Sequence, residues 1–338
     1  TKGDISLTAR TIYPATNAAF TIESAGKITT RSSGQPVPVI YSALGSVTLT
    51  AENIDHRGVV AAPLGQILFN AGKRIFLADG SVTTIEGSDM PVHYGSIDDT
   101  NLKWYGLDKS KGDFGLKVEV TDLPEKRIVF QGTDPVASEF IQMPGAEINI
   151  QGGGVVFGSG FLSGIEGTFD PLDRPDLLTK NNTSRYVLLP FDAHMSALPG
   201  DAVYLEKSGS VAEGLYAMLA LPDHRHLAFA EGARILDFQG VLDPGTLPSQ
   251  DPAGYDTVIG YAADRLTGRK DTTPKLFTIR NAADVRKQGQ YAEIGFESGA
   301  GGLLEAAAPT NIMAGVIKAG ALDTAYTAGQ VALSGQKV

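Results

Sequence analysis

The two histidines that lie closest together are the first group in this sequence that could do chemistry. His224 and His226 belong to the tetrapeptide Asp223-His224-Arg225-His226. Imidazoles at positions i and i+2 lie on one side of a strand, and Asp223 or His194 could supply a third ligand for zinc. The metalloprotease signature His-Glu-x-x-His does not occur in the chain. We therefore favour a polar turn over a zinc site, and we predict no cofactor.

Three aspartates at three-residue intervals form a second candidate metal site. Asp170, Asp173 and Asp176 lie in a proline-rich segment, and carboxylate oxygens gathered in one loop can bind Ca²⁺. The spacing is not that of an EF-hand, and Arg174 would repel a cation. These aspartates remain weak metal candidates, and the favoured interpretation is a solvated loop stiffened by proline.

Acidic and aromatic residues come together between positions 93 and 105. His93, Asp98 and Asp99 precede Trp104, the single tryptophan, and Tyr105. Carboxylates beside exposed aromatic rings are what a site that binds or cleaves sugars needs. Trp104 and Tyr105 are therefore candidate ligand-binding residues, and a polysaccharide lyase or glycosidase is the alternative function. The competing interpretation is that Trp104 forms the small core of its own segment.

The segment from residue 264 to residue 287 is basic, although the chain as a whole carries a net charge of −10. It holds seven lysines and arginines against three aspartates, which leaves a net charge of +4. Such a patch can bind an anionic glycan or lipopolysaccharide, although a solvated sheet face would have the same composition. The candidate ligand-binding residues in this segment are Arg265, Arg269, Lys270, Arg280, Arg286 and Lys287.

Composition excludes several other functions. The acidic balance argues against general nucleic-acid binding, and the absence of cysteine excludes disulfides and thiolate metal sites. No apolar run is long enough for a transmembrane helix. The sequence also has no G-x-S-x-G motif and no phosphate-binding glycine loop. We therefore do not predict an enzyme.

Short strands that begin with glycine are the elements that must position these residues. In segments 45–51 and 65–71, apolar residues alternate with polar ones, with Val47 and Leu49 matching Ile67 and Phe69. Period-two alternation bounded by glycine predicts strands. The two segments start about 20 residues apart, a plausible length for one coil of a right-handed parallel β-helix. A β-sandwich is the alternative.

The alternation also predicts which side chains face the core. We expect one continuous core formed by Val47, Leu49, Ile67, Phe69, Ile75 and Leu77. The intervening residues, such as Thr48, should face outward.

Breaks in this pattern divide the chain. We predict an all-β protein with β-helix coils over residues 1–154, a hairpin excursion near 90–124, an extra-helical β-rich domain inserted over 155–309, and a return to coils over 310–338. Within the insertion, strands are expected at 185–190, 201–205, 214–219, 257–261 and 275–279, although 211–221 could instead form a short helix. Because repeat-like sequence reaches both ends, we expect an internal fragment of a longer protein.

Several phrases resemble the filamentous haemagglutinin-type exoproteins of two-partner secretion, which are large bacterial surface adhesins. They are residues 45–51, 57–67, 77–84, 144–154 and 198–205, and the resemblance extends over about residues 3–240. It implies a secreted structural and adhesive segment on the bacterial cell surface, with a β-helical stalk presenting a binding domain in cell adhesion and virulence. The implied partners are a host or neighbouring-cell surface or an extracellular glycan, and the outer-membrane transporter of the secretion system.

Overall fold

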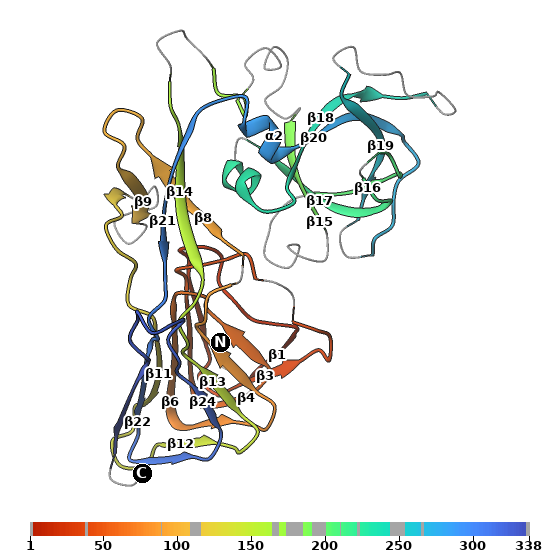
Figure 1. Ribbon diagram of the computed structural model, residues 1–338. Helices are drawn as coiled ribbons and strands as arrows, with labels where there is room; N and C mark the ends of the chain where they lie inside the picture. The colour runs from red at the N-terminus through yellow and green to blue at the C-terminus, as the bar shows by residue number, and fades with distance from the viewer. Residues whose placement is uncertain are drawn as a thin grey trace. The chain divides into compact units, whose positions relative to one another are not determined.

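The chain folds into strands arranged in two units. The computed structural model describes residues 3–37, 40–88, 90–108, 116–163, 169–173, 185–190, 201–209, 211–221, 224–243, 254–264 and 267–335. Strands make up 53% of the structure and helices 4%, so the protein is all-β, and most of its sheets are parallel. Unit 1 comprises residues 1–92, 121–156 and 295–338, and unit 2 comprises residues 93–120 and 157–294 (Figure 1).

Unit 1 contains two sheets in which every described strand pair is parallel. Its strands are β1 (Ile5–Ala9), β2 (Ala19–Glu23), β3 (Lys27–Ser32), β4 (Ser46–Arg57), β5 (Val59–Ala61), β6 (Gln66–Leu77), β7 (Val82–Thr84), β11 (Arg127–Gly132), β12 (Glu139–Gln142), β13 (Glu147–Asn149), β22 (Leu303–Ala307), β23 (Thr310–Met313), β24 (Val316–Lys318) and β25 (Gln330–Ser334). The larger sheet has the order β1-β3-β4-β6-β11-β22-β25, and the smaller has the order β24-β13-β7-β5. The β-sandwich alternative, which requires antiparallel hairpins, is therefore wrong for this unit.

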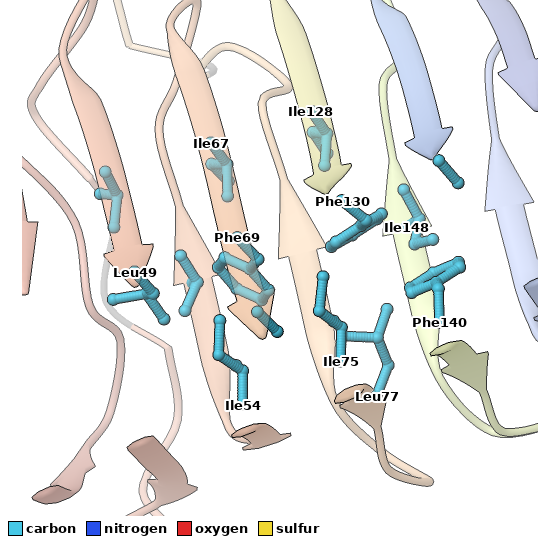
Figure 2. Packing of buried hydrophobic residues seen from close by; sticks show 14 of the residues in the cluster. Leu49, Ile54, Ile67, Phe69, Ile75, Leu77, Ile128, Phe130, Phe140 and Ile148 are labelled. Atoms are coloured by element: carbon cyan, nitrogen blue, oxygen red, sulfur yellow. The ribbon is translucent and has the colours of Figure 1, made fainter. Parts of the chain in front are cut away.

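Strand register places equivalent side chains beside each other through unit 1. Phe69 on β6 is paired with Leu49 on β4 and with Phe130 on β11, and all three side chains are fully buried. The rings of Phe69 and Phe130 meet edge to face at 5.5 Å, and Phe130 stacks on Phe140 at 4.5 Å. Figure 2 shows these side chains pointing into one core. The predicted core residues, from Val47 to Leu77, all belong to it, which confirms the predicted register.

The residues that precede successive strands of the larger sheet lie in a row with close backbone contacts, which we call the glycine column. The amide of Gln66 donates to the carbonyl of Gly45 at 3.0 Å, and that of Arg127 donates to the carbonyl of Gly65 at 3.2 Å. A Cβ on Gly65 would lie only 1.9 Å from the Gly45 oxygen, so no side chain fits there. The residues that occupy this position before β4, β6, β11, β22 and β25 are Gly45, Gly65, Lys126, Gly302 and Gly329.

One buried histidine interrupts the apolar core of unit 1. His56 is fully buried, with Nδ1 2.6 Å from the Thr30 hydroxyl and Nε2 3.1 Å from the Val82 carbonyl. These partners fix a neutral ring that donates from Nε2 and accepts at Nδ1. Burial lowers the pKa of His56 to about 4. The residue is therefore a satisfied core histidine, which the sequence did not predict.

Unit 2 contains a closed barrel and most of a further sheet. The barrel joins β15 (Arg185–Pro190), β17 (Gly214–Ala220), β16 (Asp201–Leu205), β19 (Asp256–Ala263), β20 (Lys275–Asn281) and β18 (Arg234–Val241), in that order. Among the described residues, two short helices accompany it, the 3₁₀ helix η3 (Arg225–Phe229) and α2 (Ala282–Arg286). The sheet has the order β10 (Leu116–Glu119), β9 (Trp104–Asp108), β8 (Val92–Ile97), β14 (Val155–Phe161) and β21 (Tyr291–Glu297). The first residues of β8 and β14 and the last residues of β21 belong to unit 1.

The strands predicted within the insertion are confirmed by β15, β16, β17, β19 and β20. The helix considered for 211–221 is wrong, because residues 214–220 form β17. The predicted hairpin excursion contains the antiparallel strands β8, β9 and β10. Parallel pairing resumes at β22, which begins at Leu303, whereas the sequence placed this return at residue 310. Strand β18 was not predicted.

The core of unit 1 generates a first prediction. Replacing Phe69 with alanine should lower the free energy of unfolding by about 3–5 kcal/mol, because it leaves a cavity between strands on both sides. Urea unfolding followed by circular dichroism measures this loss. The control is Thr48→Ala on β4, where the partly exposed threonine faces away from the core, and its effect should stay within about 0.5 kcal/mol. Equal losses in the two variants would contradict the register.

Candidate functional site

An exposed lysine held by two tyrosines is the main feature of the predicted basic segment. The ammonium of Lys270 lies 4.2 Å from the ring centroid of Tyr204 and 4.6 Å from that of Tyr261. Tyr204 on β16 and Tyr261 on β19 are directly opposite each other across the strand pair. Cation–π attraction therefore fixes a positive charge at this place on the barrel. Arg269, the neighbouring residue, is also exposed.

Two glutamates complete this surface. The Tyr261 hydroxyl donates to Glu206 at 2.9 Å, and the Tyr204 hydroxyl donates to Glu213. These hydrogen bonds raise the pKa of both tyrosines, so both hydroxyls remain protonated at neutral pH. We call Tyr204, Tyr261, Arg269 and Lys270 the tyrosine–lysine patch. It places two positive charges beside two aromatic rings, with Glu206 and Glu213 at the tyrosine hydroxyls.

The other basic candidates do not share this surface. Arg280 is buried, and its Nη2 donates to Asp237 at 2.8 Å, while Arg185 pairs with the same carboxylate at 2.5 Å. Arg286 lies over the ring of Phe229 at 4.5 Å. Lys287 is exposed directly after α2 and pairs with Asp284 at 2.9 Å, and Arg265 lies outside the described residues. Arg280 and Arg286 are thus packing residues, because their charges are already neutralised or covered.

The acidic and aromatic candidates around Trp104 have structural roles. Trp104 is only 2% exposed and donates from Nε1 to the Tyr94 carbonyl at 2.8 Å, so it has no open face for stacking a ligand. Tyr105 is half-buried, and its hydroxyl accepts a hydrogen bond from Asn101 at 3.1 Å. Asp98 accepts the backbone amides of the following turn. Asp99 accepts a hydrogen bond from Ser163 at 2.6 Å, which lowers the pKa of Asp99.

The candidate metal ligands are engaged in other contacts. Asp170 forms an ion pair with Arg225 and accepts a hydrogen bond from Tyr291, while Asp173 lies 3.4 Å from Arg225. Asp176, like Asp223 and His194, lies outside the described residues. His224 precedes η3, and His226 lies within this 3₁₀ helix, whose residues 227–229 are buried. Among the residues that the structure describes, no group of three or more potential ligands could hold a metal ion.

A cavity of about 330 Å³ lies in unit 1 where the chain leads into β11, β22 and β25. Its lining includes Glu297, Tyr326 and the acidic residues that precede Lys126. The Lys126 ammonium contacts three backbone carbonyls, those of Ala300 at 2.5 Å, Ser298 at 3.4 Å and Gln151 at 3.5 Å. Burial lowers the pKa of Lys126 to about 8. Because its donors are directed at these carbonyls, Lys126 is a structural residue of the cavity wall.

Lys126 binds both segments of unit 1 that flank the larger insertion, residues 157–294. Gln151 precedes β14, through which the chain passes to unit 2, and Ser298 and Ala300 follow β21, through which it returns. The Gly153 amide also donates to the Ser298 carbonyl at 2.7 Å, and the Ser298 amide donates to Gly154 at 2.9 Å. The sequence contains a sign that Lys126 has a special role, since residues 126–132 repeat the strand unit with lysine in place of the leading glycine.

Comparisons with protein-family models, with curated proteins and with solved structures found no match. Interpretation of the patch and of the cavity therefore depends on the geometry alone.

Lys126 generates the second prediction. Lys126→Met keeps a long side chain but removes every donor, so three carbonyls near the connecting segments lose a hydrogen bond. The free energy of unfolding should fall by about 1–3 kcal/mol, the usual cost of an unsatisfied buried polar group. The control is Arg127→Met, which removes a partly exposed positive charge one residue away and should change stability by less than about 0.5 kcal/mol. Urea unfolding measures both. Equal stability of Lys126→Met and the unmodified protein would contradict the assignment.

Proposed function

We propose that this chain is a structural and adhesive segment of a secreted bacterial cell-surface exoprotein, in which unit 1 is a right-handed parallel β-helix and unit 2 is an inserted binding domain. The role is binding and not catalysis. The supporting observations come from strand order, from the continuity of the core and from the tyrosine–lysine patch.

Strand order supports the solenoid. In both parallel sheets of unit 1, the spatial order of the strands follows their order along the chain, from β1 to β25 in the larger and from β5 to β24 in the smaller. A chain that winds in successive coils places each new strand beside its predecessor, whereas other parallel sheets commonly reverse their order.

The observation that carries the proposal is the continuity of this order across the insertion. Strand β11 pairs with β6 on one side and with β22 on the other, although residues 157–294 lie between β11 and β22 in the chain. Ile128 is consequently buried between Ile67 and Leu304. A scaffold whose core continues across a large inserted domain can carry that domain without contributing to its chemistry. This is the arrangement expected of a stalk that presents a binding domain.

The tyrosine–lysine patch is the proposed adhesive surface. Lys270 and Arg269 supply positive charge, and Tyr204 and Tyr261 supply rigid aromatic area with protonated hydroxyls. The proposed partner is an extracellular glycan with acidic groups, on a host or neighbouring cell. An outer-membrane transporter would export the full-length protein. None of the helices in the described part of the chain is long and apolar enough to cross a membrane.

Removal of unit 2 tests the division of roles. Residues 93–120 and 157–294 would each be replaced by a short glycine–serine linker, and the second linker starts and ends close to Gly154 and Ser298, whose backbones meet in unit 1. We expect a folded protein with parallel-strand circular dichroism that no longer binds surfaces coated with lipopolysaccharide or heparin. Binding is measured by surface plasmon resonance. If the deletion leaves it unchanged, the proposal is contradicted.

Substitution in the patch tests the surface itself. The double variant R269A/K270A should reduce binding to the same coated surfaces at least tenfold, and the loss should be larger at low salt because the contact is electrostatic. The control is Lys73→Ala on β6, which removes one exposed positive charge from unit 1. Comparable losses from Lys73→Ala and the patch variant would indicate unspecific charge attraction and would sink the assignment.

A further inference from the structure

A second group of titratable side chains lies inside unit 2, separate from the tyrosine–lysine patch. His93 on β8 lies flat against Phe229 of η3, with ring centroids 4.7 Å apart and an interplanar angle of 14°. Its ring is also stacked with that of His226, at 6.3 Å. The Nε2 atom of His93 also lies 2.7 Å from the hydroxyl of Ser159 on β14. His93 therefore connects the β8–β14 sheet to η3 within this unit.

Positive charge surrounds the two imidazoles. The Arg286 guanidinium lies over the same Phe229 ring that His93 stacks on, and Arg225 lies beside His226 in η3. The ring of His224 is 6.4 Å from that of His226. Both arginines contribute to lowering the pKa of His93, as does His226. A proton on either ring would therefore meet like charges.

The acidic groups that face this cluster are already paired with arginines. Asp170 and Asp173 lie against Arg225, and Glu293 on β21 lies 3.3 Å from Arg286. Tyr291 donates to Asp170. Among the other charged groups on or beside the elements packed against η3 and α2, Arg185 and Arg280 pair with Asp237, and Lys287 pairs with Asp284, whereas Arg234 on β18 and Lys275 on β20 add further positive charge.

Burial keeps both rings neutral in the packed state. Desolvation lowers the pKa of His93 to about 3 and that of His226 to about 4, from an ordinary value near 6.5. A solvated imidazole, in contrast, would titrate near its ordinary value.

We propose that this cluster is an acid-sensitive latch, in which protonation of His93 and His226 separates η3 from the β8–β14 sheet. The latch is independent of the proposed adhesive role, because it depends only on contacts within unit 2. Two imidazolium rings at this separation, beside two guanidinium groups and away from water, would repel one another. Opening gives both rings water and relieves the repulsion.

The direction of the pH effect follows from proton linkage. A group whose pKa is depressed in the packed state stabilises packing above its ordinary pKa, and this contribution is lost as the pH falls below it. Below pH 6.5, each histidine favours the open state about tenfold per pH unit. For two histidines, the equilibrium lies roughly a thousandfold further toward the open state at pH 5 than at a pH well above 6.5, where both rings are neutral.

The single tryptophan reports on the latch. Trp104 packs against Gly158 of β14, where a Cβ would lie 2.3 Å from its Nε1. Gly158 stands between Phe157 and Ser159, both of which contact His93. Displacement of His93 should therefore change the fluorescence of Trp104.

The test is an acid titration of the whole chain from pH 7.5 to pH 4. We expect a change in Trp104 fluorescence between pH 6.5 and pH 4, at a higher pH than the loss of far-ultraviolet circular dichroism. His93→Gln and His226→Gln should each move the fluorescence midpoint at least half a pH unit lower. His56→Gln, which alters the buried histidine of unit 1, is the matched control and should leave this midpoint unchanged. Identical midpoints in the unmodified protein and both latch variants would overturn the proposal, as would coincidence with global unfolding.

Hydrogen exchange of the unmodified protein keeps the test decisive if a variant fails to fold. After correction for the intrinsic pH dependence of exchange, peptides covering 225–229 should lose protection between pH 7.5 and pH 5, whereas those covering 46–57 in β4 should retain it. Retained protection of residues 225–229 at pH 4.5 would overturn the latch.

Discussion

Unit 1 depends on one constraint, which is that the inward side chains of each strand must be covered by the neighbouring strands. Phe69 is buried because Leu49 and Phe130 occupy the same register position on either side of it. Any segment that leaves this arrangement must return in register, or the core would be exposed to water. The glycine column meets the same constraint in the backbone, because chains that approach as closely as Gly45 and Gly65 leave no room for a side chain. Lys126 departs from the column where the larger insertion leaves and returns, and its ammonium supplies hydrogen bonds to the carbonyls there.

The sequence predicts unit 1 better than unit 2, for a physical reason. Strands β4 and β6 have one face toward the core and one face that is partly exposed, so alternation identifies the direction of inward residues such as Val47 and Phe69. Strand β15 is different, because Val187, Leu188 and Leu189 are consecutive and all buried. A strand covered on both faces gives no alternation, and so the sequence could not indicate that Arg185, Asp237 and Arg280 form a buried network. Of the candidates in the basic segment, only Arg269 and Lys270 lie in the tyrosine–lysine patch. The contact between His93 and Ser159 joins residues far apart in the chain, and no local pattern predicts such a pair.

The two units use charge differently. The core of unit 1 is apolar with the exception of a few hydrogen-bonded groups such as His56. Unit 2 buries two arginines on one aspartate and packs a third arginine on an aromatic ring. Buried ion pairs of this kind contribute little net stability, but they are costly to break. Such a difference suits the proposed roles, since a scaffold needs uniform packing whereas a binding domain needs polar groups held in fixed positions.

The two connections that lead into and out of the larger insertion, residues 157–294, run side by side. Gly153 and Gly154 exchange backbone hydrogen bonds with Ser298, so the polypeptide leaves unit 1 and comes back at almost the same point. For the genome that encodes it, the segment 157–294 is therefore a cassette with adjacent ends. Recombination can replace such a cassette with any other domain whose termini are close together, without altering the strands on either side. A surface protein built in this way can change what it recognises while its scaffold sequence stays the same.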